Sequence, residues 1–152
     1  MPAPAPVAFL RSRIGYAQPA QSAMLKTAIP VIHVSNSVQA EEFYCAGLGF
    51  RVVGCWRPSG VTEDPCYLTL EREKVRLHVT SFKDGTVGTW TSNVYIFVED
   101  VDTLYAELLS SGSAKPSAPV DQTWGKREIG VRDADRNVIT FGQRIASAST
   151  QS

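Results

Sequence analysis

An internal repeat constrains the fold of this chain more than any other feature of its sequence. The segment "IHVSNSV" at residues 32–38 matches "IFVEDV" at residues 96–101, because each is a strand-like Ile-x-Val followed by polar residues and a valine. Likewise, "YLTLEREKVRLHV" and "IGVRDADRNVITF" each read as a strand, a charged turn and a second strand. The repeat therefore predicts two halves with the element order β-α-β-β-β, each about 55 to 60 residues long.

Neither half is expected to fold alone, because a unit of this size rarely covers its hydrophobic face by itself. We therefore expect an α+β fold in which two βαβββ modules combine to form a concave mixed β-sheet. Helices are expected to start near Asn36 or Ser37 and within the acidic segment 99–102. The expected strands cover residues 29–34, 50–56, 65–71, 74–82 and 93–98, and a closing hairpin lies within 124–141.

Composition divides the chain into three parts. The first 23 residues are rich in proline, alanine and serine, and regular hydrophobic patterning starts just after them. A segment of that composition buries too little apolar surface to fold. We predict a disordered extension over residues 1–26, one folded domain over 27–145 and a disordered tail over 146–152.

The charge balance and the hydropathy pattern argue against two classes of partner. The formal net charge is +0, which does not provide the basic field that nucleic-acid binding requires. No apolar run approaches the roughly 20 residues that span a bilayer. Because three of the 15 basic residues and none of the 15 acidic residues lie in the first 40 positions, the folded part carries a mild negative charge, which favours cationic ligands.

The cysteines Cys45, Cys55 and Cys66 are odd in number and lack metal-type spacing. Such a pattern indicates a reducing compartment, here the cytoplasm, and no disulfide framework. We expect all three side chains to pack in or near the core as small apolar groups.

Two segments carry a resemblance to a known superfamily. "IPVIHVSNSVQAEEFYCAGLGF" is a strand-helix block in which Phe-Tyr is followed by Leu-Gly-Phe, and "WGKREIGVRDADRNVITF" closes the second half. Together with the paired halves, these segments resemble the vicinal oxygen chelate superfamily, which includes glyoxalase I, extradiol dioxygenases and bleomycin-resistance proteins. The resemblance covers residues 28–144, and the closing block is most similar to the bleomycin-binding branch. Ala134 and Arg136 stand where that branch has proline and glycine, a departure confined to the turn.

The resemblance implies no catalytic metal and no cofactor for this chain. Metal-dependent relatives place His, Glu or Gln at four points that converge on one cation. Carried over to this sequence, three of these points fall at Ile29, Asn93 and Thr140, which are not competent ligands, and only His78 falls near the fourth. A shifted metal site that uses His33 and His78 remains as the alternative.

The same resemblance implies that the inner face of the sheet is a ligand groove. Alternation along residues 93–97 places Asn93, Tyr95 and Phe97 on one face. Trp124 can stack on a flat ligand, and Gly125 lets the backbone approach it closely. The predicted ligand-binding residues are Trp90, Asn93, Tyr95, Phe97, Trp124, Arg127 and His78. No catalytic residue is predicted, because the chain lacks the usual nucleophile and phosphate-binding motifs.

The leading functional prediction is non-catalytic binding and sequestration of a bulky, partly aromatic small molecule. A bleomycin-family antibiotic or a similar compound would fit, and its capture would give antibiotic resistance. The resemblance implies a homodimer whose groove lies between subunits, with the segment 25–34 as an exchanged strand. The alternatives are a glyoxalase- or dioxygenase-related enzyme, a lyase or oxidoreductase with a divergent or absent metal site, and a regulatory or interaction module.

Overall fold

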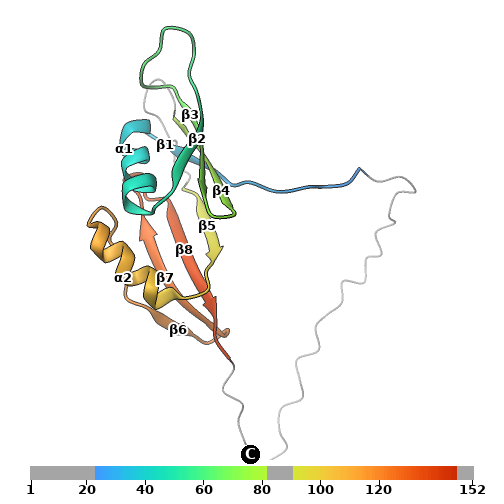
Figure 1. Ribbon diagram of the computed structural model, residues 1–152, viewed down its shortest axis with the longest axis vertical. Coiled ribbons are helices and arrows are strands. Elements are labelled where there is room, and N and C mark those ends of the chain that lie inside the picture. The colour runs from blue at the N-terminus through green and yellow to red at the C-terminus, as the bar shows by residue number, and fades with distance from the viewer. Residues whose placement is uncertain (1–22, 82–90, 147–152) are drawn as a thin grey trace, which may run out of the picture.

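The computed structural model describes residues 23–81 and 91–146, and within them the two modules follow one another along the chain (Figure 1). The first module consists of β1 (Val31–Val34), α1 (Ser37–Glu41), its π-helical continuation η1 (Glu42–Gly47), β2 (Arg51–Trp56), β3 (Tyr67–Arg72) and β4 (Val75–Ser81). The second module consists of β5 (Asn93–Phe97), α2 (Val101–Ser111), β6 (Val120–Gln122), β7 (Lys126–Arg132) and β8 (Val138–Arg144).

Each module forms its own four-stranded mixed sheet, and the two sheets have the same topology. The strand orders are β1-β4-β3-β2 and β5-β8-β7-β6. In each sheet the first strand of the module pairs in parallel with the last, whereas the other pairs are antiparallel. This shared topology confirms the α+β class and the βαβββ repeat. The strands are divided between two sheets.

Side chains in the predicted capping segments start both helices. The Asn36 side chain accepts a hydrogen bond from the Gln39 N–H, and the Asp100 side chain accepts one from the Thr103 N–H, both at 2.9 Å. These bonds satisfy N–H groups that a helix leaves without an internal partner. Helix α2 ends at Gly112, whose φ of 70° lies in the left-handed region that favours glycine.

The core lies between each sheet and its helix. Buried side chains alternate with more exposed ones along β1, β3, β4 and β7. Both helices cover the same side of the molecule (Figure 1). Among the described residues, no helix lies on the opposite face of either sheet. The largest buried core side chains include Ile32, Tyr44, Leu48, Leu68, Leu70, Leu77, Val79, Val101, Leu108, Ile129 and Ile139.

The turn between β7 and β8 joins the second module to the first. Tyr44 Oη donates a hydrogen bond to Asp133 Oδ2 at 2.8 Å, and Asn137 Nδ2 donates one to the His33 carbonyl at 2.9 Å. Arg136 has a φ of 67°, so a non-glycine residue adopts the left-handed conformation where the resemblance placed glycine. The charged turn therefore has a structural role as one of the links between the modules.

The three cysteines are free thiols in different environments. Cys66 is buried and Cys45 is half-buried, whereas Cys55 is exposed. Cys55 lies on β2, which is an edge strand of its sheet. The prediction that all three pack in or near the core is therefore wrong for Cys55.

The ends of the chain lie mostly outside the described residues. The predicted disordered segments 1–26 and 146–152 overlap them only at 23–26 and at 146, which have no regular secondary structure. Within residues 23–81 and 91–146, no helix is long and apolar enough to cross a membrane.

Candidate functional site

Three aromatic side chains lie on the open face of the second sheet. Tyr95 and Phe97 alternate with the buried Ile96 along β5 and are 43% and 57% exposed, and Trp124, in the turn before β7, is 62% exposed. Asn93 is exposed at the start of β5, and the period of two puts it on the same face. We call Tyr95, Phe97 and Trp124 the aromatic face.

Glu128 on β7 holds two of these rings with one carboxylate oxygen. Its Oε1 accepts a hydrogen bond from Tyr95 Oη at 2.8 Å and another from Trp124 Nε1 at 3.0 Å. The Tyr95 ring crosses over Gly142 on β8, where a Cβ atom would overlap the tyrosine hydroxyl. Burial of the hydroxyl, together with the hydrogen bond and charge of Glu128, raises the pKa of Tyr95 to about 12.

Phe97 completes the aromatic face. Its ring packs edge-to-face against Tyr95 with the centroids 5.1 Å apart, and Arg144 Cζ lies 5.3 Å from its centroid. Both rings line a groove of about 550 Å³ formed by residues 27–30, 74–77 and 94–97. This volume lies within the usual range of small-molecule sites. The groove therefore lies between Tyr95 and Phe97 of the aromatic face and the start of β4 in the first module.

A second aromatic group lies on the open face of the first sheet. Tyr67 Oη and His78 Nδ1 are 2.8 Å apart, and their rings meet edge-to-face at 5.3 Å between centroids. Trp56, opposite Tyr67 in the β2–β3 ladder, is 65% exposed. Sequence reasoning found His78 but missed Trp56 and Tyr67. The alternation of Tyr67 with the buried Leu68 was the sequence signal that could have found the tyrosine.

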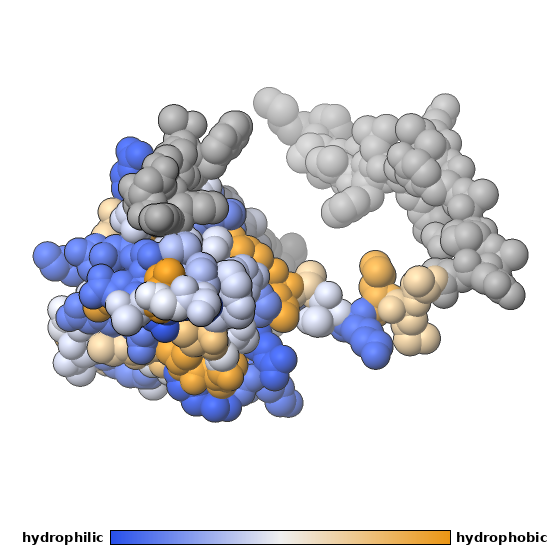
Figure 2. All heavy atoms as spheres, turned by 90° about the horizontal axis from the view of Figure 1, so that it is seen from above, coloured by the Kyte–Doolittle hydropathy of each residue, from blue (hydrophilic) through white to orange (hydrophobic). Residues whose placement is uncertain are grey.

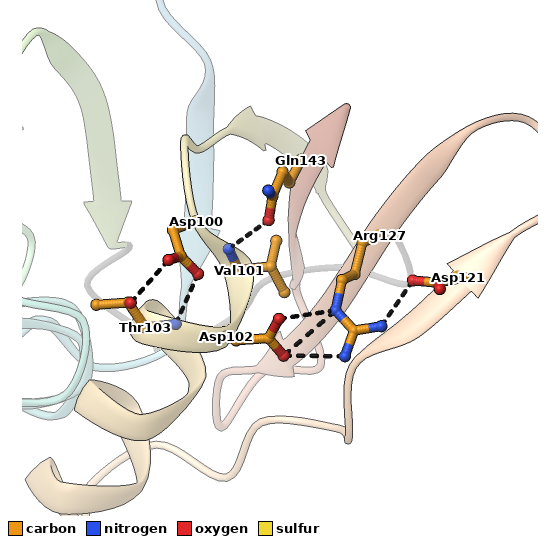
Figure 3. Close-up of polar contacts among 7 residues, drawn as sticks. All are labelled: Asp100, Val101, Asp102, Thr103, Asp121, Arg127 and Gln143. Atoms are coloured by element: carbon orange, nitrogen blue, oxygen red, sulfur yellow. Dashed lines mark hydrogen bonds and ion pairs between the residues drawn. The ribbon is translucent and has the colours of Figure 1, made fainter. Parts of the chain in front are cut away.

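Arg127 extends from β7 toward the start of α2 (Figure 3). Its guanidinium forms ion pairs with Asp102 on α2 at 2.9 Å and with Asp121 on β6 at 2.6 Å. It alternates with Glu128 along β7, so the two side chains leave the strand in opposite directions. The structure therefore separates Arg127 from the other predicted ligand contacts, because its charge is bound to α2 and β6.

The same helix end shows how the second module fixes α2 on its sheet. The Val101 N–H donates a hydrogen bond to Gln143 Oε1 at 2.9 Å, next to the Asp100 cap (Figure 3). Asp102 follows in the first turn of the helix, where a negative side chain interacts favourably with the helix dipole. Asp100 and Asp102 at this helix start are thus accounted for by capping and by the ion pair to Arg127.

The two histidines lie on neighbouring strands. His78 on β4 is opposite Val31 on β1, and His33 is opposite Thr80. Both histidines therefore lie on the open face of the first sheet. They are not direct partners, because His33 pairs two residues beyond His78. Among residues 23–81 and 91–146, no group of three or more His, Cys, Asp or Glu side chains is arranged to hold a metal ion. Trp90, the remaining predicted ligand contact, lies outside the described residues.

Comparison with known proteins finds a matching family and similar individual proteins. A family model described as "Glyoxalase superfamily protein" matches residues 16–148. Bleomycin resistance proteins of Geobacillus stearothermophilus and Staphylococcus aureus are 28% identical over 137 residues, which cover 79% of this chain and 98% of each relative. This agrees with the resemblance inferred from the opening and closing segments.

Solved structures share the fold at lower sequence identity. The bleomycin-binding protein of Streptomyces verticillus, in complex with copper(II)-bleomycin, has a TM-score of 0.60 at 22% identity and covers 83% of this chain and 100% of its own. A glyoxalase-related enzyme from Clostridium phytofermentans has a TM-score of 0.66 at 17% identity, with coverages of 82% and 99%. One fold thus serves both a binding protein and an enzyme-related protein, so these structures confirm the fold class alone.

Proposed function

The chain belongs to the glyoxalase superfamily, and on that premise we propose that it binds and sequesters a bulky, partly aromatic small molecule without changing it chemically. The ligand class is that of the bleomycin-family antibiotics or of compounds with similar chemistry. Capture of such a compound lowers its free concentration and thereby gives resistance. We infer a cytoplasmic location, because free thiols are typical of a reducing compartment.

The observation that carries this proposal is the aromatic face. Tyr95, Phe97 and Trp124 are exposed, and Glu128 fixes two of their rings in place. Exposed aromatic side chains that are held in one orientation can stack on flat groups with little loss of side-chain entropy. Stacking on a protein aromatic ring contributes roughly 1–3 kcal/mol per flat group, by analogy with nucleic-acid bases.

Electrostatics support a ligand that carries positive charge. Glu128 places a carboxylate between the Tyr95 hydroxyl and the Trp124 indole. A cationic group on the ligand can therefore pair with this carboxylate while a flat group stacks on the adjacent rings. Two stacking contacts together with such a pair approach the roughly −8.2 kcal/mol of a micromolar complex.

The relatives support the same assignment. The chain matches bleomycin resistance proteins over 98% of their length, and a bleomycin-binding protein shares its fold. Binding rather than catalysis is favoured by these relatives. The described residues contain no group of three or more His, Cys, Asp or Glu side chains arranged to hold a metal ion. Metal-dependent chemistry would need such a cluster to polarise the substrate or activate water.

The resemblance predicts an exchanged strand over residues 25–34, but residues 31–34 form β1 and pair with β4 of the same chain. We further infer that the binding unit is a homodimer in which the remaining arm, the segment 23–30, packs on a second copy of the chain. This segment extends away from the body of the molecule (Figure 1), and its apolar side chains lie apart from it (Figure 2). Met24 and Leu25 are 88% and 94% exposed, and apolar side chains on an extended arm are stabilised by burial against a partner. The groove that includes residues 27–30 lies beside Tyr95 and Phe97, so the arm and the aromatic face adjoin each other.

Fluorescence titration tests the binding proposal. Addition of bleomycin or phleomycin to the full chain is expected to quench tryptophan emission with saturation in the micromolar range. Trp124→Ala is expected to weaken binding, whereas Leu109→Ala, an exposed position on α2, serves as the control and leaves it unchanged. A titration that produces no change up to millimolar ligand would reject the proposal for this class of compound.

Sedimentation measurements test the dimer separately. The full chain and a chain that starts at Ala23 are both expected to sediment as dimers, whereas a chain that starts at Ala28 is expected to be monomeric. A monomeric full chain would contradict the dimer. If the chain that starts at Ala28 is also a dimer, only the proposed role of the arm is contradicted, and the dimer itself is supported.

The enzyme alternative rests on the positions of His33 and His78 on adjacent strands. It predicts that purified protein holds stoichiometric zinc, nickel or manganese, or that one of these ions raises its melting temperature. Elemental analysis of the purified chain decides between this metal-dependent form of the alternative and the binding proposal.

A further inference from the structure

Two cysteines that the proposed function does not use are in contact at one end of the first sheet. Cys55 Sγ and Cys66 Sγ are 3.7 Å apart. Cys55 lies opposite Leu68 in the β2–β3 ladder, and Cys66 precedes Leu68 by two residues. The period of two therefore puts both cysteines on the same side of the sheet, so strand register brings the thiols together.

The two thiols differ in exposure and in electrostatic surroundings. Cys55 is exposed, and Arg57 Nη1 donates a hydrogen bond to its Sγ at 2.8 Å. A guanidinium in this position stabilises the negative charge that a thiol carries when it acts as a nucleophile. Cys66 is only 2% exposed, and burial, followed by the contact with Cys55, raises the pKa of Cys66 to about 11. The buried thiol is therefore protonated at neutral pH and shielded from direct attack.

We propose that Cys55 and Cys66 form a peroxide-sensitive disulfide, with Cys55 as the attacking thiol and Cys66 as the resolving thiol. Cys55 Sγ attacks one oxygen of hydrogen peroxide, the O–O bond breaks, and water leaves, which produces a sulfenic acid on Cys55. Cys66 Sγ then attacks this sulfur, the S–O bond breaks, and a second water leaves. The two thiols lose two electrons and the peroxide gains them. A dithiol reductant reverses the reaction by thiol–disulfide exchange.

Disulfide formation alters one rim of the first sheet. Diagonal neighbours on antiparallel strands are about 7–8 Å apart between Cα atoms, and a disulfide brings that distance to at most about 6.8 Å. Among the described strands, β2 is hydrogen-bonded only to β3, so a shift at its Cys55 end breaks no ladder on its other side. Trp56, next to Cys55, moves with it, and the disulfide therefore connects the redox state to the open face of the first sheet.

The disulfide also closes the loop 56–65 covalently. This loop is already anchored at its far end, because the Asp64 carboxylate accepts hydrogen bonds from Ser81 Oγ and from the Ser37 N–H. Arg57 Nε donates a hydrogen bond to the Glu63 carbonyl at 2.8 Å, which holds the guanidinium near Cys55. The loop is thus held at both ends, and the guanidinium lies where it favours oxidation of Cys55.

Peptide mapping of the full chain after treatment with hydrogen peroxide tests the proposal. The chain is expected to lose two of its three thiols, retain Cys45 in the thiol form, and lose two hydrogen atoms in mass. Cleavage after Glu63 separates the two cysteines in sequence, so the fragments are expected to remain joined until a reductant is added. Any of three results would overturn the proposal: retention of all three thiols, oxidation of Cys55 beyond the sulfenic acid without a crosslink, or a crosslink between two chains.

Three variants distinguish the roles of the residues. Cys66→Ser is expected to leave a sulfenic acid on Cys55 that dimedone traps, and Cys55→Ser is expected to prevent both the sulfenic acid and the disulfide. Arg57→Gln is expected to slow the oxidation of Cys55 without changing the final number of thiols lost, as a positioning role requires. Cys45→Ser is the matched control, and loss of the disulfide in this variant would contradict the assignment.

Discussion

The Tyr95 hydroxyl donates a hydrogen bond to Glu128, 33 residues further along the chain, at 2.8 Å. The bond crosses β8 above Gly142. Because glycine has no side chain, nothing at this position obstructs the tyrosine ring. The same carboxylate oxygen accepts a hydrogen bond from Trp124. The proposed ligand face therefore depends on one glycine and one carboxylate that together set the orientation of two rings.

Gly142→Ala is expected to displace the Tyr95 ring and break its hydrogen bond to Glu128. A Cβ atom at this position would overlap the tyrosine hydroxyl. The variant is expected to lose ligand affinity. The matched control is Gly130→Ala on β7, where a Cβ atom would have only an ordinary contact 3.8 Å from Ser117 Oγ. Equal ligand affinity in the two variants, measured by titration, would show that Tyr95 does not need its observed position.

Glu128→Gln is expected to lower the pKa of Tyr95 toward 10. Its folded-state pKa of about 12 is raised by burial and then by the hydrogen bond and charge of Glu128, and glutamine removes the charge. Because the folded pKa exceeds the unfolded value, Tyr95 contributes stability that is fully present below about pH 10 and is lost as the pH rises toward about 12. Ultraviolet titration of tyrosinate, compared with Tyr95→Phe to assign the signal, measures the shift. An unchanged titration curve would remove Glu128 as a cause.

Trp124→Ala is expected to weaken binding of an aromatic cation by about 5- to 150-fold in Kd, which corresponds to roughly 1–3 kcal/mol of lost stacking. Trp124→Phe retains a ring and is expected to recover part of this loss. The measurement is calorimetric titration, because the fluorescence of the variant is itself changed. Full affinity in Trp124→Ala would place the ligand elsewhere on the molecule.

Arg127→Ala is expected to leave ligand affinity unchanged and to lower thermal stability slightly. Arg127 is bound to Asp102 and Asp121 on the helix side of the sheet, and exposed ion pairs of this kind contribute little to stability. The loss of stability should decrease as salt concentration rises, because salt screens exposed charges. A large fall in ligand affinity would show that Arg127 contributes to ligand binding.

Tyr44→Phe is expected to reduce the free energy of unfolding by roughly 1.5–3 kcal/mol, the range for a hydrogen bond to a charged group. Tyr44 and Asp133 are both buried and join the first module to the second at 2.8 Å. Urea denaturation at neutral pH measures the change, with Tyr105→Phe on α2 as the control at a half-buried tyrosine. Equal stability of the two variants would contradict the importance of this link between modules.

The sequence by itself determined the repeat, the capping segments of both helices and the face shared by Asn93, Tyr95 and Phe97. These features depend on local periodicity, since neighbouring side chains along a strand point to opposite faces. The same periodicity also assigns the side chains of β7 to the two faces of the sheet. Arg127 alternates in step with the buried Ile129, which already placed it on the helix side and left Glu128 on the open face.

Only the tertiary structure decided which side chains meet across strands. The contacts from Glu128 to Tyr95 and Trp124, from Tyr67 to His78, and from Cys55 to Cys66 all depend on strand order and register. Register is set by the burial of whole sheet faces and by turn geometry, and these long-range conditions are not encoded in any short segment. The sequence therefore supplied the residues of the proposed site, and strand pairing determined which of them act together.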